Sequence, residues 1–164
     1  MKKLLFLTSL PFYLLSCHYA QQKDWLSTIS TLPSFDIQLT DSLTLLHTQN
    51  IPAGQPIVVL YFRPDCPHCQ AETQRLIRQI GLLKDSRLYF LTGASLVDAK
   101  SYAHHFLLDR YPNITVGKDK DHFFLKTFRL SSIPCIAIYN REKRLVKIYH
   151  GEVPIDAVIA TIQG

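Results

Sequence analysis

Two cysteines separated by two residues are the feature of this 164-residue sequence with the clearest chemical meaning. Cys66 and Cys69 lie in the stretch RPDCPHCQAE, which covers residues 63–72. Thiols at this spacing either bind a metal ion or form a disulfide that passes electrons. The choice between the two depends on which other ligands the chain offers and on the compartment in which it works.

A zinc site is disfavoured by the small number of further ligands. Structural zinc usually takes four Cys or His side chains, often supplied as two pairs. The chain has one such pair, with His68 inside it, and Cys135 far along the sequence. His104 and His105 are adjacent on a predicted helix, so they point about 100° apart and cannot both face one ion. We therefore predict neither a metal site nor a cofactor.

The N-terminus predicts an export signal. Residues 1–16 begin with Lys2 and Lys3, followed by an apolar stretch of about twelve residues that is too short to span a bilayer as a helix. This stretch ends in LLSC (14–17), which resembles the lipobox of bacterial lipoproteins. The resemblance implies cleavage before Cys17 and lipid attachment to that residue. The alternatives are an ordinary secretory signal or a buried N-terminal helix.

A lipid on Cys17 would anchor the chain to a membrane of the bacterial cell envelope, facing the periplasm or the exterior. Thiols can persist as disulfides there. Removing residues 1–16 leaves 148 residues, enough for one domain, and lowers the formal net charge from +5 to +3. Basic and acidic residues are interspersed, so we expect no nucleic-acid partner.

Residues 17–34 are mostly polar and are interpreted as a tether. Within it, Trp25 and Leu26 are candidates for packing against the domain that follows. That domain is predicted to cover residues 35–164.

Hydrophobic patterning predicts an α/β domain around the cysteines. The apolar run IVVLYF (57–62) is typical of a buried central strand, and the residues after Cys69 repeat at helical spacing. The other predicted strands cover residues 87–92, 113–116, 135–139 and 144–150, and the other helices cover 96–110, 121–128 and the segment after Pro154. Residues 35–39 and 43–47 are predicted to form an N-terminal β-ribbon.

A strand, a CxxC motif that opens a helix, and SSIP (131–134) before a β-hairpin together resemble the thioredoxin fold. This implies a central mixed sheet flanked by helices. Pro33-x-Phe35, VVLYF, CPHCQAE and SSIP are most similar to membrane-tethered TlpA/ResA-like thiol–disulfide oxidoreductases, whereas CPHC itself is the motif of DsbA-type disulfide oxidases. The resemblance implies protein thiols or disulfides as substrates and a separate redox partner, and it leaves the direction of electron flow open.

The start of a helix suits this chemistry, because disulfide exchange requires an accessible thiolate. Cys66 is predicted to lie where free backbone N–H groups and the helix dipole favour the thiolate. Pro67 fits the first turn, where its missing N–H costs nothing. His68 adds a donor and partial positive charge. Cys69 lies one turn deeper and is predicted to be the resolving thiol.

Two acidic residues flank the motif. Asp65 stands where thioredoxins commonly have Trp; it is predicted to cap the helix, and its charge opposes ionisation of Cys66. Glu72 follows Cys69 by three residues and matches a glutamate of the TlpA/ResA-like proteins. Two roles are open for it: accepting the Cys69 proton during exchange, or an i,i+3 ion pair with Arg75.

The resemblance also implies that Pro134 is cis and faces the cysteines. Ile133 would then offer backbone hydrogen bonds to a substrate chain, and Pro67 is the second predicted substrate contact. The alternative is a trans proline at the start of an edge strand. Cys135 follows directly and is predicted to be a small core residue rather than a third redox centre.

Other functions fit the sequence less well. The peroxiredoxin signature PxxxTxxC fails, because Val59 and Arg63 occupy the required positions before Cys66. A copper- or metal-binding envelope protein would use the cysteine pair with His150 or His122, since soft thiolates and imidazole suit copper. A redox-inert interaction domain is the third alternative.

Overall fold

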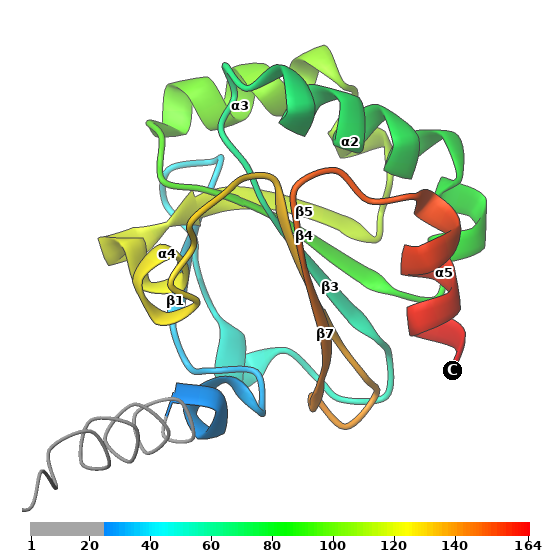
Figure 1. Cartoon of the computed structure of the whole chain (residues 1–164). Coiled ribbons are helices and arrows are strands. Elements are labelled where there is room, and N and C mark those ends of the chain that lie inside the picture. The colour runs from blue at the N-terminus through cyan, green and yellow to red at the C-terminus, as the bar shows by residue number, and fades with distance from the viewer. Residues whose placement is uncertain (1–24) are drawn as a thin grey trace, which may run out of the picture.

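The computed structural model describes residues 25–164, which form one seven-stranded mixed sheet covered by helices on both faces (Figure 1). The strand order is β2-β1-β5-β4-β3-β6-β7. This architecture confirms the predicted α/β class.

The centre of the sheet carries the apolar run that precedes the cysteines. β3 (Ile57–Tyr61) lies parallel to β4 (Arg87–Thr92), and β4 lies parallel to β5 (Ile114–Asp119). On its other side β3 pairs antiparallel with β6 (Cys135–Tyr139), which forms a hairpin with β7 (Leu145–His150). Every residue of β3 is buried, as expected of a strand covered on both faces.

The predicted β-ribbon is part of the same sheet. β1 (Asp36–Leu39) pairs antiparallel with both β2 (Leu45–His47) and β5. Gly117 of β5 permits this approach, because a Cβ atom there would collide with the side chain of Ile37 and lie 2.8 Å from the Gln38 carbonyl oxygen.

The helices differ in the face that they cover. The α-helices are α2 (Pro67–Arg78), α3 (Leu96–His105), α4 (Phe123–Thr127) and α5 (Ile155–Gln163), residues 25–29 are also helical, and 3-10 turns cover Thr48–Asn50, Ile80–Leu83, Leu108–Arg110 and Lys120–His122. Helices α2, α3 and α5 pack on the face of β3 that presents Val58 and Leu60. Helix α4 and residue Ile29 pack on the opposite face, with Val59 and Tyr61. The two cores follow from the alternation of side chains along the strands.

Helix α3 is shorter than the predicted helix over residues 96–110. It ends at His105, because Leu107 adopts a left-handed conformation with φ 54° and a separate 3-10 turn follows. The apolar spacing over 96–110 would have placed Leu107 on the inward face, but its side chain is 40% exposed, and Leu108 is fully buried instead.

The described part of the predicted tether contacts the domain. Trp25 Nε1 donates a hydrogen bond to the Thr127 carbonyl over 2.6 Å, and Ile29 is fully buried. The Leu32 N–H bonds to the Lys143 carbonyl at 2.9 Å. Leu26, in contrast, is largely exposed. The signal segment and Cys17 lie outside the described residues.

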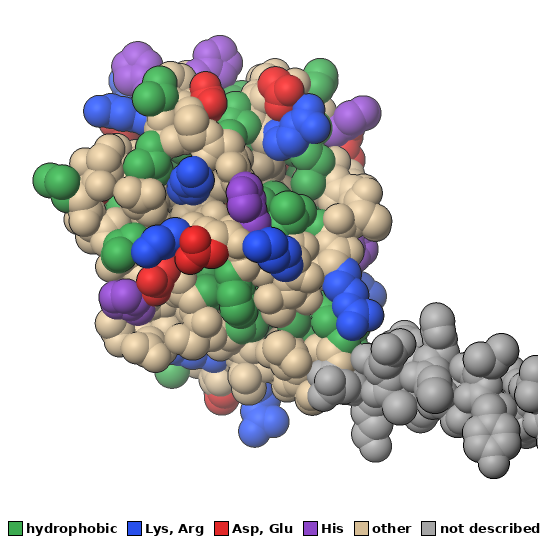
Figure 2. All heavy atoms as spheres, turned by 90° about the vertical axis from the view of Figure 1, so that its left-hand side faces the viewer, with side chains coloured by type: hydrophobic (Ala, Val, Ile, Leu, Met, Phe, Trp, Pro, Cys, Tyr) green, Lys and Arg blue, Asp and Glu red, His purple; other side chains and the backbone are tan. Residues whose placement is uncertain are grey.

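The surface near α4 carries mixed charge. On the face that Figure 2 presents, cationic, anionic and apolar side chains are interspersed. Within residues 25–164, no helix combines the length and apolar character that crossing a membrane requires.

Candidate active site

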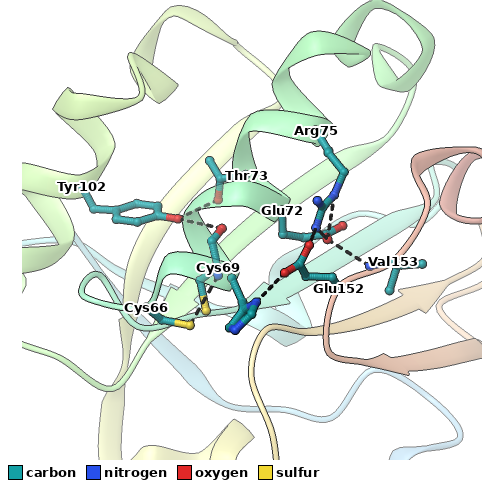
Figure 3. Close-up of polar contacts among 9 residues, drawn as sticks. Cys66, Cys69, Glu72, Thr73, Arg75, Tyr102, Glu152 and Val153 are labelled. Carbon is teal, nitrogen blue, oxygen red and sulfur yellow. Dashed lines mark hydrogen bonds and ion pairs between the residues drawn. The ribbon is translucent and has the colours of Figure 1, made fainter.

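The sulfur of Cys66 caps helix α2. Cys66 is the N-cap residue, and its Sγ accepts a hydrogen bond from the Cys69 N–H at 3.4 Å (Figure 3). Pro67 is the first residue of the helix, as predicted. The prediction that Asp65 caps the helix was wrong, because the capping atom is Sγ of the next residue, Cys66. Both cysteines are free thiols.

The two thiols differ in access to solvent. Cys66 retains 8% of its surface, whereas Cys69 is fully buried. Strand β3 and the buried Phe62 lead into Cys66, so the pair lies beyond the carboxyl end of a central parallel strand. Ligands of open α/β sheets bind at this edge.

Burial raises the pKa of Cys69 to about 12, with a further contribution from its hydrogen bond to Cys66. The Tyr102 hydroxyl lies 3.2 Å from the Cys69 carbonyl, to which it donates, and 2.7 Å from Thr73 Oγ1. The Tyr102 ring also packs on Phe62, with 4.2 Å between the ring centroids. The sequence analysis did not identify Tyr102 as a contact of the motif. Its position three residues after the buried Ala99 does indicate that it lies on the inward face of the helix.

The charge of Asp65 is paired. Arg63 Nε and Nη2 each lie 3.0 Å from one oxygen of the Asp65 carboxylate. The guanidinium holds the pKa of Asp65 below its usual range, chiefly through these hydrogen bonds. The negative charge beside Cys66 is therefore compensated by a residue that the sequence interpretation did not connect to it.

Glu72 is a fully buried carboxylate with two unequal oxygens. Its Oε2 accepts from Arg75 Nη2 at 2.6 Å and from the Val153 N–H at 3.0 Å. Its Oε1 is buried and has no hydrogen-bond partner among residues 25–164. The ion pair with Arg75, one of the two roles open from the sequence, is thus present, and one oxygen remains free to accept a proton.

The network extends from Glu72 to the helix start. Arg75 Nη2 also lies 2.7 Å from Glu152 Oε2, and the second oxygen of Glu152 contacts His68 Nδ1. Hydrogen bonds from His68 and Arg75 lower the pKa of Glu152. His68 and Glu152 are 84 residues apart in the chain, and no local pattern predicts their contact.

The Ile133–Pro134 peptide bond is cis, as predicted. Pro134 is buried directly before β6, whose Cys135 pairs with Tyr61 at the end of β3. This places Ile133 beside the segment that leads into Cys66. The backbone N–H and carbonyl of Ile133 make no hydrogen bond within the described part of the chain.

Cys135 faces away from the cysteine pair. It is fully buried in the core on the α4 side of the sheet, with Ala137 and Tyr139, whereas Cys66 and Cys69 belong to the core on the α2 side. Burial raises the pKa of Cys135 to about 12. These features support the predicted role as a small core residue.

The histidines considered for copper are not gathered around the thiols. Among residues 25–164, no three His, Cys, Asp or Glu side chains are grouped as a metal-ligand set. The His122 ring instead lies next to Gly93 and the Tyr61 hydroxyl, where a Cβ on the glycine would clash with it. The donor arrangement therefore gives the metal-binding alternative no support.

A groove of about 690 Å³ adjoins the residues before Cys66 and before Pro134. Its lining includes Arg63, Ile133, Leu125, Leu130 and His122. It therefore offers apolar walls and a few polar groups close to Cys66, which is the more accessible thiol of the pair.

Comparison with known proteins identifies the fold. No protein-family model matches the chain, and no curated protein sequence matches it. Among solved structures, it is similar to a secreted Mycobacterium tuberculosis disulfide oxidoreductase homologous to Escherichia coli DsbE, with 16% identity, a TM-score of 0.66, and coverage of 79% of this chain and 94% of that chain. The chain has a thioredoxin-like fold.

Two further structures agree with this fold. StoA from Bacillus subtilis is 13% identical, with a TM-score of 0.58 and coverage of 80% of this chain and 98% of that chain. A candidate thioredoxin from Neisseria meningitidis is 17% identical, with a TM-score of 0.66 and coverage of 80% and 86%, respectively. The predicted thioredoxin-like architecture, with its β-ribbon, is therefore confirmed.

Proposed function

We propose that the chain is a thiol–disulfide oxidoreductase of the bacterial cell envelope that exchanges disulfides with protein substrates through Cys66 and Cys69. One observation carries the proposal: the partly accessible thiol of Cys66 caps a helix and accepts a hydrogen bond from the backbone N–H of Cys69, whose own thiol is fully buried. A helix start supplies donors and a positive dipole end, which favour a thiolate. The accessible, helix-capping Cys66 is therefore the nucleophile, and Cys69 is the resolver.

The exchange takes two displacements. The Cys66 thiolate attacks one sulfur of a client disulfide, which forms a mixed disulfide and releases the other client sulfur as a thiolate. Cys69 then loses its proton and attacks Cys66 Sγ, which releases the second client thiolate and leaves a Cys66–Cys69 disulfide. The client gains two electrons and the site loses two. Oxidation of a client runs the same steps in reverse.

Glu72 is the proton acceptor for Cys69 in this scheme. Its free, buried Oε1 and its position one helical turn after Cys69 support this role. A thiol whose pKa is raised by burial needs a base before it can attack. The ion pair with Arg75 is compatible with the role, because it uses the other oxygen.

The client chain would bind beside the cis proline. The unpaired backbone groups of Ile133 can pair with an extended segment, as in β-strand addition. Pro67, on the first turn of α2, would contact the same segment close to Cys66. The groove that Leu125 and Leu130 line would accommodate apolar side chains of the client.

The proposed location is a membrane surface. Lipid on Cys17 would tether the domain, and residues 25–34, which lie on the domain, would lead to it. A further redox protein would restore the site after each cycle. We place the reduction potential between those of thioredoxin, about −270 mV, and of DsbA-type oxidases, about −120 mV.

Trapping of mixed disulfides tests the function. In Cys69→Ser the second displacement is blocked, so client proteins should stay bound through Cys66 and appear as reducible adducts in envelope extracts. Cys66→Ser should trap none, and Cys135→Ser should behave as wild type. Adducts formed by Cys66→Ser and absent from Cys69→Ser would reverse the assignment of the two thiols.

A further inference from the structure

Glu72 is an unusual group because it is a fully buried carboxylate beside a redox motif. A buried carboxyl group needs hydrogen-bond donors or a cation to compensate the loss of water around its oxygens. Among the described residues, Glu72 forms an ion pair with Arg75, whose Nη2 lies 2.6 Å from Glu72 Oε2. The Val153 N–H donates a hydrogen bond to the same oxygen. The position of the Glu72 carboxylate therefore depends on Arg75.

Arg75 is itself fixed in place by a second carboxylate. Glu152, in the loop between β7 and α5, lies 2.7 Å from the same Nη2 atom that binds Glu72. The other oxygen of Glu152 contacts His68, inside the CPHC motif. The guanidinium is thus held between the buried Glu72 and the half-exposed Glu152 (Figure 3).

We propose that Arg75, oriented by Glu152, is a positioning residue that holds the Glu72 carboxylate in place, with Oε1 free to accept the Cys69 proton during ring closure. The inference rests on the proposed thiol chemistry and assigns the groups that control its proton acceptor. In the step concerned, the Cys69 proton moves to Glu72 Oε1 and the Cys69 sulfur bonds to Cys66 Sγ. The sulfur that leaves Cys66 carries away the electron pair of the broken S–S bond.

The expected pH dependence follows from the buried Cys69 thiol and the charged groups near it. Helix α2 contributes Cys69, His68, Glu72 and Arg75, and the loop before α5 contributes Glu152. Without the guanidinium, the Glu72 carboxylate loses the ion pair that holds it in place, and the Cys69 proton must pass to solvent base instead. Because burial raises the pKa of Cys69 to about 12, that route becomes faster as pH rises, so the profile of ring closure would move to higher pH.

Ring closure can be measured without a client by mixing the full-length reduced protein with Ellman's reagent in a stopped-flow spectrometer. Attack by Cys66 releases one thionitrobenzoate in a phase that depends on reagent concentration. Attack by Cys69 on the resulting mixed disulfide releases a second in a concentration-independent phase, which Cys69→Ser must lack. This second phase reports the proposed step alone.

Arg75→Met should slow the second phase at least tenfold at pH 7, since general base catalysis contributes about 10²–10⁴-fold, and the rate should recover toward wild type as pH rises. Glu152→Ala should shift the profile in the same direction by a smaller amount. Arg75→Lys, which keeps the charge, and Arg78→Met, which removes an exposed arginine one turn along the same helix, should keep the wild-type profile.

Equal slowing of Arg75→Met at every pH, or a profile identical to that of Arg78→Met, would overturn the proposal. If Arg75→Met did not fold, Glu152→Ala would decide, and an unshifted profile in that variant would count against the assignment. A wild-type protein that closed the ring but trapped no client in Cys69→Ser would contradict the proposed function and leave this inference intact.

Discussion

The backbone N–H of Cys69 donates a hydrogen bond to Cys66 Sγ over 3.4 Å. The helix is therefore capped by the thiol that we propose as the nucleophile, and the donor comes from the proposed resolving residue. A charged acceptor strengthens such a bond. Because forming the disulfide removes the charge from Cys66, the cap favours the reduced state of the pair.

Alkylation should separate the two thiols by their ionisation. Burial disfavours the thiolate of Cys69 and raises its pKa to about 12, so its ionised fraction at pH 8 is small and grows as pH rises toward that value. In Cys66→Ser, iodoacetamide should therefore modify Cys69 slowly from pH 6 to 9, with a rate that climbs steadily above pH 9. Mass spectrometry should show much faster modification of Cys66 in Cys69→Ser at pH 8. Equal rates for both residues at that pH would contradict this.

Removing His68 should make the cysteine couple more reducing. His68 is paired with Glu152, so His68→Ala leaves that carboxylate paired with Arg75 alone among the described residues, increases the uncompensated negative charge near the motif and disfavours a thiolate at Cys66. The side chain is 71% exposed, so we expect a shift on the order of 10–20 mV after equilibration with glutathione. His104→Ala, an exposed site on α3, is the control and should leave the potential unchanged. A shift toward positive potential in His68→Ala would be the wrong sign.

Arg63 and Asp65 should affect the potential in opposite directions. Their side chains bind each other through two hydrogen bonds of 3.0 Å. Asp65→Asn leaves Arg63 unneutralised next to the thiols and should make the couple more oxidising, whereas Arg63→Gln should make it more reducing. The double variant should return close to wild type. Shifts of the same sign in both single variants would show that the pair does not act through its charge.

Cys17 should be the acylated N-terminus of the mature protein. The lipobox-like LLSC predicts cleavage after residue 16, so intact-mass analysis of membrane-extracted protein should show a chain without residues 1–16 that carries lipid. Cys17→Ser should prevent this processing and release the protein from the membrane fraction. Unmodified Cys17 in the extracted wild-type protein would argue for an ordinary secretory signal.

Local patterns in the sequence were sufficient for much of the fold. The apolar run at 57–62 is a buried strand because a strand covered on both faces needs no alternation of polar residues. Pro67 marks the first turn of α2, because a missing N–H is tolerated there. Helix α3 was predicted too long, because its apolar spacing continues past the point where Leu107 turns the chain.

The partners of the thiol site were decided by tertiary structure. The sequence identified Cys66, Cys69, Glu72 and Pro134 through a motif and a resemblance, each with a role set by its neighbours along the chain. It could not pair His68 with Glu152, because contacts across 84 residues depend on how the loop before α5 packs against α2. For the same reason, the sequence could not show on which side of the sheet Cys135 lies relative to Cys66 and Cys69. Which core a strand residue faces depends on the register of that strand with β3. Periodicity determines which face of a helix or strand is apolar, and only packing determines which charge meets which.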